Sequence, residues 1–356
     1  MIRAAVAAFA ALLSVSAGGA PPSDRIDAIA GAAGLHGLVL VGDADGSALV
    51  RRYGADAPAE NAVWRWASVT KQLTALIIMQ EVAAGRIELD LPVARYWPDW
   101  KAANAGTITI RQLLRHQSGL ADPSESATDK DGMPPFYRAT GAAASAEAEA
   151  QGFCAGPPRA APGGEFHYNN CDFIVLGVVL QKISGKPFAD LLADRIAVPL
   201  DLKSVGLFPV DGGGPVQVAG FDTKGVAEPR VNLGTYAAAG AAYGTIRDLW
   251  AIDRALMDNR LLDKVATAAM WAGDPALGFA ALGQWSFAVP LKGCPDPVAI
   301  VERRGAIGGI EIRNFLLPAQ RRALIIFTDR AEFPFGEVWQ ASGPSYELLS
   351  AAACPA

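Results

Sequence analysis

The chain contains 356 residues, 51% of them hydrophobic, and has a formal net charge of −5 at pH 7. A chain of this length and apolar content can bury at least one full-sized core, which argues against a disordered protein. The slightly acidic balance, without a long run of Lys and Arg, excludes nucleic acid as an expected partner.

The first twenty residues have the pattern of a secretory signal peptide. Arg3 precedes an apolar run from Ala4 to about Val15, and small residues follow at positions 17–20. The apolar run is shorter than the roughly 20 residues needed to span a bilayer. The sequence therefore predicts a signal peptide over residues 1–20 and a secreted or periplasmic protein with no permanent membrane anchor.

A hairpin pattern and a helical pattern follow. Leu38 to Val41 and Ala48 to Tyr53 flank an Asp-Gly step at 45–46, which favours a tight β-hairpin. From Ser68 to Ala84 apolar residues recur at helical spacing, and Gly85 provides a natural C-terminal stop. We therefore predict a hairpin followed by a buried helix that begins at Ser68.

The middle and the end of the chain differ in pattern. Helical patterns in the middle, separated by loops rich in Pro and Gly, lie at 110–114, 173–183 and 188–196. A further helix is expected at about 247–257 and a last one at roughly 336–352. Apolar runs between these two helices indicate antiparallel strands at 285–291, 298–302, 310–317 and 323–328.

Strands at both ends of the chain with helices between them predict an α+β fold. The expected architecture is an antiparallel sheet flanked by helices, with an inserted mainly helical lobe. We assign residues 21–90 and 235–356 to a discontinuous α/β sandwich lobe and residues 91–234 to the helical lobe. A ligand cleft is expected where the two lobes meet.

The chain has four cysteines, an even number in a protein expected to enter an oxidising compartment. Of the three possible pairings we predict Cys154 with Cys171, which bracket the loop carrying Tyr168, and Cys294 with Cys354, because the C-terminal tail could reach the strand connection at Cys294. Four buried free thiols are the alternative. The Cys and His spacings do not match a zinc site, so no metal and no other cofactor is expected.

Ser68-Val69-Thr70-Lys71 is a Ser-x-x-Lys sequence at the predicted start of a buried helix. Residues three apart lie on one helical face, so the Lys71 amine lies one turn from the Ser68 hydroxyl. A lysine can take a serine proton only when its pKa is lowered, and a helix N-terminus supplies N–H groups for an oxyanion. The structural alternative is that Ser68 caps the helix while Lys71 extends to solvent.

Two further segments carry groups suited to the same chemistry. Tyr168-Asn169-Asn170 offers a phenol that could pass a proton and a carboxamide that could hold a substrate, although a packed aromatic and a helix cap are the simpler roles. The segment 303–309, Arg-Arg-Gly-Ala-Ile-Gly-Gly, lies at the end of one expected strand and the start of the next, and its glycines let another backbone approach closely. Taken alone, this segment would be a β-turn flanked by surface arginines.

Taken in this order, the three segments resemble the motifs of the serine β-lactamase and penicillin-binding-protein superfamily. The closest likeness is to its class C branch and to the related esterases and D-amino-acid peptidases. Tyr96-Trp97-Pro98 and the run from Leu113 to Leu120 are similar to further stretches of that family. The resemblance extends from about residue 25 to 350 and implies the β-lactamase/transpeptidase-like fold.

The resemblance implies a role for each motif residue. Ser68 would be the nucleophile, with Lys71 and Tyr168 sharing the general-base and general-acid work. Substrate binding would fall to Asn170, Arg303, Arg304 and Gly305, with Gly305 keeping the strand edge clear. The oxyanion hole would consist of the backbone N–H groups of Ser68 and Ala306.

We therefore expect a secreted serine hydrolase that cleaves an ester, amide or peptide bond of a small molecule, a β-lactam included, through an acyl-enzyme. A catalytically weak or inactive penicillin-binding or sensor-like module of the same fold is the alternative. The class C branch usually has Lys and Thr where this chain has Arg303 and Arg304, and Lys-to-Arg is not conservative at such a site. Short-chain esters or a small amide are therefore expected to react faster than cephalosporins. The absence of a Gly-x-Ser-x-Gly elbow argues against a His-dependent serine hydrolase of the α/β-hydrolase kind.

Overall fold

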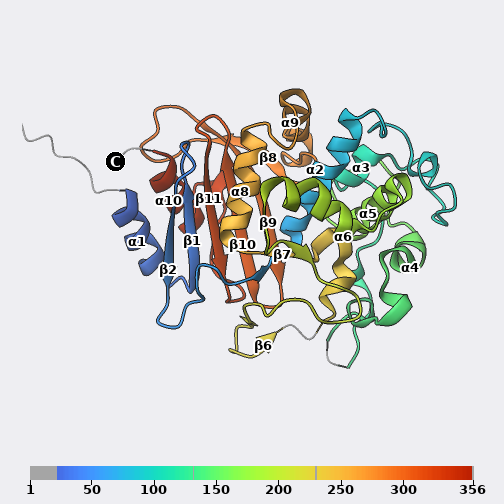
Figure 1. Ribbon diagram of the computed structural model, residues 1–356, viewed down its shortest axis with the longest axis horizontal. Coiled ribbons are helices and arrows are strands. Elements are labelled where there is room, and N and C mark those ends of the chain that lie inside the picture. Colours follow the sequence, from blue (N-terminus) through green and yellow to red (C-terminus); the bar gives the residue numbers. More distant parts are fainter. Residues whose placement is uncertain (1–21, 131, 229–230, 355–356) are drawn as a thin grey trace, which may run out of the picture.

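A six-stranded antiparallel sheet forms the centre of the computed structural model, which describes residues 22–130, 132–228 and 231–354 (Figure 1). The strand order is β2-β1-β11-β10-β9-β8. The strands are β1 (Gly37–Gly42), β2 (Ala48–Tyr53), β8 (Trp285–Val289), β9 (Val298–Ile307), β10 (Ile310–Leu317) and β11 (Arg322–Thr328). The first hairpin thus joins strands from the far end of the chain, with Gly37 opposite Thr328. The predicted signal peptide lies outside the described residues.

The end of β9 differs from the sequence prediction. The strand was expected to stop at residue 302, with the two arginines in the connection, but it continues to Ile307 and carries Arg303, Arg304 and Gly305 within it. Gly308 and Gly309, with φ of 53° and 73°, then form a two-residue turn into β10. Positive φ at both positions is the requirement of a type I′ hairpin turn, whose twist matches that of the strands.

Helices cover both faces of the sheet. On one face, α1 (Pro22–Ala32) and α10 (Gly343–Ala353) lie side by side over an apolar layer that includes Val39, Phe315 and Ile326 (Figure 1). On the other face, α2 (Thr70–Ala83) and α8 (Ile246–Met257) contribute to a larger core. The last helix begins at Gly343, later than predicted, because the chain first turns at Gly336, which has a positive φ, and then forms a 3₁₀ turn at Val338–Gln340.

Most of the remaining helices lie on the right of Figure 1. They are α3 (Ile110–Leu114), α4 (Ala146–Gln151), α5 (Cys171–Ser184), α6 (Phe188–Leu192), α7 (Ala237–Gly240) and α9 (Lys264–Met270). The shorter strands are β3 (Trp64–Arg65), β4 (Gly206–Leu207) and β7 (Ala242–Gly244) in one small sheet, and β5 (Gly220–Phe221) with β6 (Ala227–Glu228) in another. The helix predicted at 188–196 is α6 followed by a π-turn at Ala193–Ala197. The predicted α+β architecture is confirmed; the lobe boundaries at 90 and 235 stay predictions.

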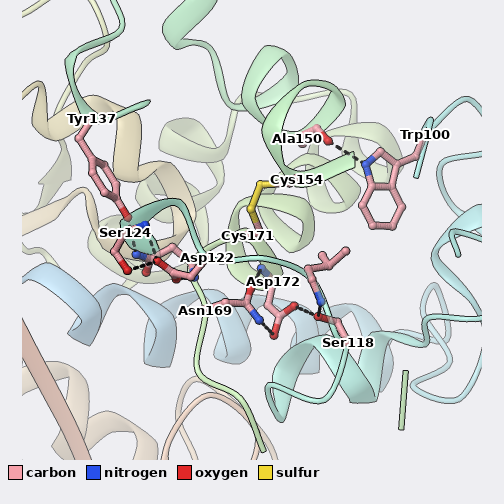
Figure 2. The surroundings of a disulfide bond; sticks show 12 residues. Trp100, Ser118, Asp122, Ser124, Tyr137, Ala150, Cys154, Asn169, Cys171 and Asp172 are labelled. Atoms are coloured by element: carbon pink, nitrogen blue, oxygen red, sulfur yellow. Dashed lines mark hydrogen bonds between the residues drawn. A yellow bond between two sulfur atoms is a disulfide. The ribbon is translucent and has the colours of Figure 1, made fainter. Parts of the chain in front are cut away.

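Both predicted disulfides are present. Cys154–Cys171 joins the turn after α4 to the first residue of α5 (Figure 2), and Cys294–Cys354 joins the β8–β9 connection to the end of α10. The first bridge closes a loop of 17 residues that contains Tyr168. It therefore fixes the chain just before α5, where the Tyr-x-Asn segment lies.

Candidate active site

Ser68 lies in a 3₁₀ turn, Ala67–Val69, directly before α2, so the regular helix begins two residues later than predicted. Ala67 has a positive φ of 48°, a strained conformation for a residue with a Cβ. The turn is held because Thr70 Oγ1 donates to Ala67 O at 2.6 Å and accepts from Ala242 N at 3.0 Å. Strain of this kind persists only where the surroundings determine it, and here it presents the Ser68 side chain at the start of the helix.

Lys71 is fully buried, and its amine has three hydrogen-bond partners. Nζ lies 3.1 Å from Ser68 Oγ, 2.7 Å from Asn170 Oδ1 and 2.8 Å from the carbonyl oxygen of Ala239. Burial is the main reason that the pKa of Lys71 is lowered, and the charge of Arg303 lowers it further. A neutral amine has two N–H groups, which match the two carbonyl-type acceptors, and one lone pair, which then faces the Ser68 hydroxyl.

Tyr168 approaches Ser68 from the loop before α5. Its hydroxyl donates to Ser68 Oγ at 2.7 Å, so Lys71 and Tyr168 contact the same oxygen. Burial raises the pKa of Tyr168, but the positive charges of Lys71 and Arg303 outweigh this effect and lower the pKa to about 8. A phenol with such a pKa can both give and take a proton near neutral pH.

Arg303 is 2% exposed and belongs to the site itself. Its Nε donates to the carbonyl oxygen of Ser68 at 2.7 Å, and its Nη2 donates to the Tyr168 hydroxyl at 2.9 Å. The guanidinium carbon also lies 5.2 Å from the centre of the Trp285 ring. The sequence placed Arg303 among the substrate-binding residues, whereas two of its donors are used by the nucleophile segment and the tyrosine.

Arg304 likewise has partners within the protein. It forms ion pairs with Glu302 and, at 2.6 Å, with Glu337, and its guanidinium lies 4.6 Å from the centre of the exposed Trp339 ring. Its charge is therefore balanced before any substrate arrives. Arg313, which sequence reasoning missed, is its direct neighbour on β10. Among the described residues, the Nε of Arg313 has no hydrogen-bond partner.

Asn170 was expected to hold the substrate, but its carboxamide is engaged by the protein at both ends. Oδ1 accepts from Lys71, and Nδ2 donates to the Tyr137 hydroxyl at 2.9 Å. The backbone N–H of Asn170 donates to Asp122 at 2.5 Å. Sequence reasoning missed Tyr137 and Asp122 because the loop that carries them has no periodic pattern, and only the distance to Asn170 reveals their role.

Gly305 occupies a position where a side chain would collide with the nucleophile segment. A Cβ there would lie 2.4 Å from the carbonyl oxygen of Trp66 and 3.3 Å from the Ala67 Cβ. The glycine was expected to leave space at the strand edge for the substrate. The space that a side chain at position 305 would fill is instead occupied by Trp66 and Ala67. The next residue, Ala306, lines the same cleft as Ser68, so the two N–H groups expected in an oxyanion hole come from adjacent segments.

A buried polar network around Asp172 holds the Tyr-x-Asn segment in place. Asn169, the middle residue, is fully buried and donates from Nδ2 to Asp172 at 3.0 Å; Ser118 also donates to Asp172 (Figure 2). His116 lies 3.1 Å from Asp172, and its ring centre is 4.5 Å from that of Tyr168. Burial raises the pKa of Asp172 and lowers that of His116. The run from Leu113 to Leu120, which the sequence singled out without a role, thus packs against the catalytic tyrosine candidate.

The cleft at this site has a volume of about 470 Å³. It is lined by the predicted residues Ser68, Tyr168, Arg303, Arg304, Gly305 and Ala306, together with Trp285, Glu311 and Arg313. Lys71 and Asn170 contact this group through the hydrogen bonds described above. In the part of the chain that the structure describes, no group of three or more His, Cys, Asp or Glu side chains could hold a metal ion.

Comparisons with known proteins find similar sequences and similar structures. The family model described as Beta-lactamase matches residues 22–341. The chain is 30% identical to the esterase EstB of Burkholderia gladioli over 179 residues, which is 48% of this chain and 44% of the esterase. It is 29% identical to the D-alanyl-D-alanine-carboxypeptidase/endopeptidase AmpH of Escherichia coli over 196 residues, 52% of this chain and 48% of AmpH. The chain thus matches about half the length of these two relatives.

Solved structures share the fold. The D-stereospecific amidohydrolase from a Streptomyces species has a TM-score of 0.76 at 24% identity, with coverage of 94% of this chain and 99% of that one. A penicillin-binding protein from Bacillus halodurans has a TM-score of 0.70 at 23% identity, with coverage of 92% and 98%. The predicted β-lactamase/transpeptidase-like fold is therefore confirmed.

Proposed function

The chain belongs to the beta-lactamase family, and from that membership we propose that it hydrolyses an ester or amide bond of a small molecule through an acyl-enzyme on Ser68. One observation carries the proposal: Ser68 Oγ lies in a cleft within hydrogen-bond distance of both Lys71 Nζ and the Tyr168 hydroxyl. A serine hydroxyl is a weak nucleophile until a base removes its proton, and both of these groups are close enough to exchange protons at the reacting oxygen.

Acylation uses both groups at once. Ser68 Oγ attacks the carbonyl carbon of the substrate while its proton passes to the lone pair of Lys71 Nζ. As the tetrahedral intermediate collapses, the bond to the leaving group breaks, and the Tyr168 hydroxyl donates its proton to the leaving oxygen or nitrogen. The product of this step is an acyl-serine, with Lys71 as the ammonium and Tyr168 as the phenolate.

Deacylation returns both protons. Water attacks the acyl carbonyl and gives a proton to the Tyr168 phenolate, and the Lys71 ammonium protonates Ser68 Oγ as the ester bond breaks. Between the two steps the phenolate must be stabilised, and Arg303 donates to that oxygen at 2.9 Å. A guanidinium keeps its charge throughout the cycle, so it can serve this purpose without taking part in the proton transfers.

The oxyanion of each tetrahedral intermediate would lie between the N–H groups of Ser68 and Ala306. Preorganised donors of this kind act where charge develops and commonly contribute about 10²–10³ in rate per donor. Asn170 and Arg304, expected to bind the substrate, are proposed instead to hold Lys71 and to balance the two glutamates beside the cleft. Gly305 is proposed to leave room for the nucleophile segment.

The substrate is proposed to be a short-chain ester or a small amide rather than a cephalosporin. Arg303 replaces a lysine that could change its protonation, and Arg304 is already paired with two carboxylates. One of the relatives is named an esterase, which is consistent with an ester substrate.

A secreted or periplasmic location is proposed from the two disulfides, because such bonds persist in oxidising compartments. Within the described residues, the helices are all too short or too polar to span a bilayer.

The test uses the purified chain with a fluorophosphonate probe and three substrates: p-nitrophenyl butyrate, nitrocefin and a D-Ala-D-Ala peptide. We expect labelling at Ser68, turnover with the ester fastest, and loss of both in Ser68→Ala with an unchanged melting temperature. Lys71→Ala and Tyr168→Phe should each reduce kcat/KM by roughly a hundredfold or more. No labelling of the folded chain would favour the binding or sensor module, and near-wild-type turnover by Ser68→Ala would reject the mechanism.

A further inference from the structure

Two buried arginines link the nucleophile segment to the end of β9 in opposite directions. From β9, Arg303 Nε donates to the carbonyl oxygen of Ser68 at 2.7 Å. From the nucleophile segment, Arg65 Nε donates to the carbonyl oxygen of Ile307 at 2.9 Å, and Arg65 Nη2 donates to the next carbonyl, that of Gly308. The first link ends at Ser68 and the second ends just beyond Ala306.

We propose that Arg65 is a positioning residue for the oxyanion hole: it holds the Ala306 N–H at the separation from the Ser68 N–H that a tetrahedral intermediate requires. This inference rests on the proposed acyl-enzyme function. Arg65 precedes Ser68 by three residues and lies in β3, which pairs with β7. Its partners follow Ala306 directly in the chain, so the two N–H groups lie between the two arginine links.

The end of β9 lacks a strand partner on the side of β8, so another contact must restrain it there. β8 pairs with β9 only from Val298 to Glu302, so beyond that point β9 has a strand partner, β10, on one side only. The following turn consists of two glycines, the residue type with the greatest backbone freedom. An N–H group that is to act as a preorganised donor must be held within a fraction of an ångström. The Arg65 hydrogen bonds supply that restraint at the turn.

The chemistry of Arg65 also points to a specific role. The side chain is 0% exposed, and it forms no ion pair among the residues described here. Burial lowers the pKa of Arg65 to about 10, so the guanidinium remains charged at neutral pH. The charge of Glu228 offsets part of the cost of burying Arg65, but no carboxylate among the described residues pairs with the guanidinium, and an apolar side chain would fill the same space without that cost. Only a guanidinium has a rigid fork that can donate to two successive carbonyls.

The test compares Arg65→Lys and Arg65→Met with the wild type. The readouts are kcat/KM for p-nitrophenyl butyrate and the inhibition constant of phenylboronic acid, which adds to a serine hydroxyl as a tetrahedral anion. We expect kcat/KM to fall roughly tenfold in Arg65→Lys and roughly a hundredfold in Arg65→Met, with the inhibition constant rising by the same factors and KM changing less than about threefold. The matched control is Gln217→Leu, which removes only the third partner of Arg65, at 3.2 Å.

A fall in kcat/KM without a parallel rise in the boronate constant would overturn the inference, as would variants that lose only thermal stability. If Arg65→Met does not fold, Gly220→Ala replaces it, because a Cβ there would lie 2.1 Å from the Gly308 oxygen and 2.6 Å from Arg65 Nη2. If the wild type neither hydrolyses esters nor binds the boronate, the proposed function fails. The role of Arg65 is then tested by amide hydrogen exchange over residues 303–310. Faster exchange in the Arg65 variants than in Gln217→Leu supports the restraint, and equal exchange rejects it.

Discussion

The Arg303 guanidinium donates to the Tyr168 hydroxyl at 2.9 Å, and the charge of Arg303 lowers the pKa of both Tyr168 and Lys71. In the proposed acylation step Lys71 must be neutral and Tyr168 protonated, so the two groups define the two limbs of a pH profile. An alkaline limb near pH 8 is expected, since the pKa of Tyr168 is about 8.

Arg303→Gln is expected to move both limbs of this profile to higher pH. Removing a positive charge disfavours the phenolate and favours the ammonium, so the pKa values of Tyr168 and Lys71 both rise. The measurement is kcat/KM for p-nitrophenyl butyrate from pH 5 to 10 in the wild type, in Arg303→Gln and in Tyr168→Phe, which should lack the alkaline limb. A wild-type rate that continues to rise through pH 9 would make Tyr168 the base in acylation instead of the acid.

Gly305→Ala is expected to reduce kcat/KM by roughly a hundredfold, because displacements of about 1 Å at reacting groups have effects of this size. The new Cβ would lie 2.4 Å from the Trp66 carbonyl oxygen, so either β9 or the nucleophile segment must move. Gly106→Ala is the control, since no atom lies within 4 Å of a Cβ at that position and its φ is not positive. Equal activity of the two variants would show that the close approach at Gly305 has no part in catalysis.

Removal of the two disulfides should separate stability from activity. Replacing Cys154 and Cys171 together by Ala should lower the unfolding free energy by about 3 kcal/mol in the chain-entropy model and should also lower kcat, because the bridge holds the loop of Tyr168. Replacing Cys294 and Cys354 should cost about 4 kcal/mol, for the longer loop, with kcat unchanged. Urea unfolding and steady-state kinetics on both double variants provide the comparison. A loss of kcat in the second variant alone would contradict it.

Asp253 is expected to make stability fall with rising pH. Its side chain is fully buried, and burial raises its pKa to about 7 although Gln72 donates to it at 2.7 Å. Between about pH 4 and pH 7 the folded chain therefore binds a proton at this carboxyl that the unfolded chain has lost, so the contribution to stability declines over that window and stays low above it.

Asp253→Asn should abolish this decline. The unfolding free energy is measured in urea at pH 5 and pH 8 for the wild type, for Asp253→Asn and for the exposed control Asp99→Asn. The change in unfolding free energy from pH 5 to pH 8 should be more favourable in Asp253→Asn than in Asp99→Asn, by an amount on the order of 2 kcal/mol. An equal change in all three proteins would place the titrating group elsewhere.

Local patterns were sufficient for most strands and for the nucleophile motif, but not for residues whose role depends on distant partners. The hairpin at 45–46 follows from an Asp-Gly step, and the strand at 310–317 follows from its apolar residues despite Glu311, Arg313 and Asn314; both are confirmed. β9 was predicted too short because Arg303 and Arg304 are not typical strand residues. Both side chains have hydrogen-bond or ion-pair partners that compensate for their burial in the sheet.

Arg65 and Tyr137 illustrate the same limit of sequence patterns. Arg65 lies between two tryptophans and gives no local signal, because its acceptors follow 242 residues later. The partner of Tyr137, Asn170, is 33 residues away across a loop without periodicity. Such contacts are determined by tertiary packing, which the spacing of residue types along one chain does not encode.

The position of β1 between β2 and β11 determines when the candidate active site can form during synthesis. Ser68, Lys71 and Tyr168 leave the ribosome early, but β9 and β11 are made late, and β1 has no second partner until β11 has emerged. Non-local pairing of this kind is slow and leaves strand edges exposed meanwhile. A stalled nascent chain that ends before Val298 should therefore contain the whole Ser-Lys-Tyr set and still fail to react with a fluorophosphonate.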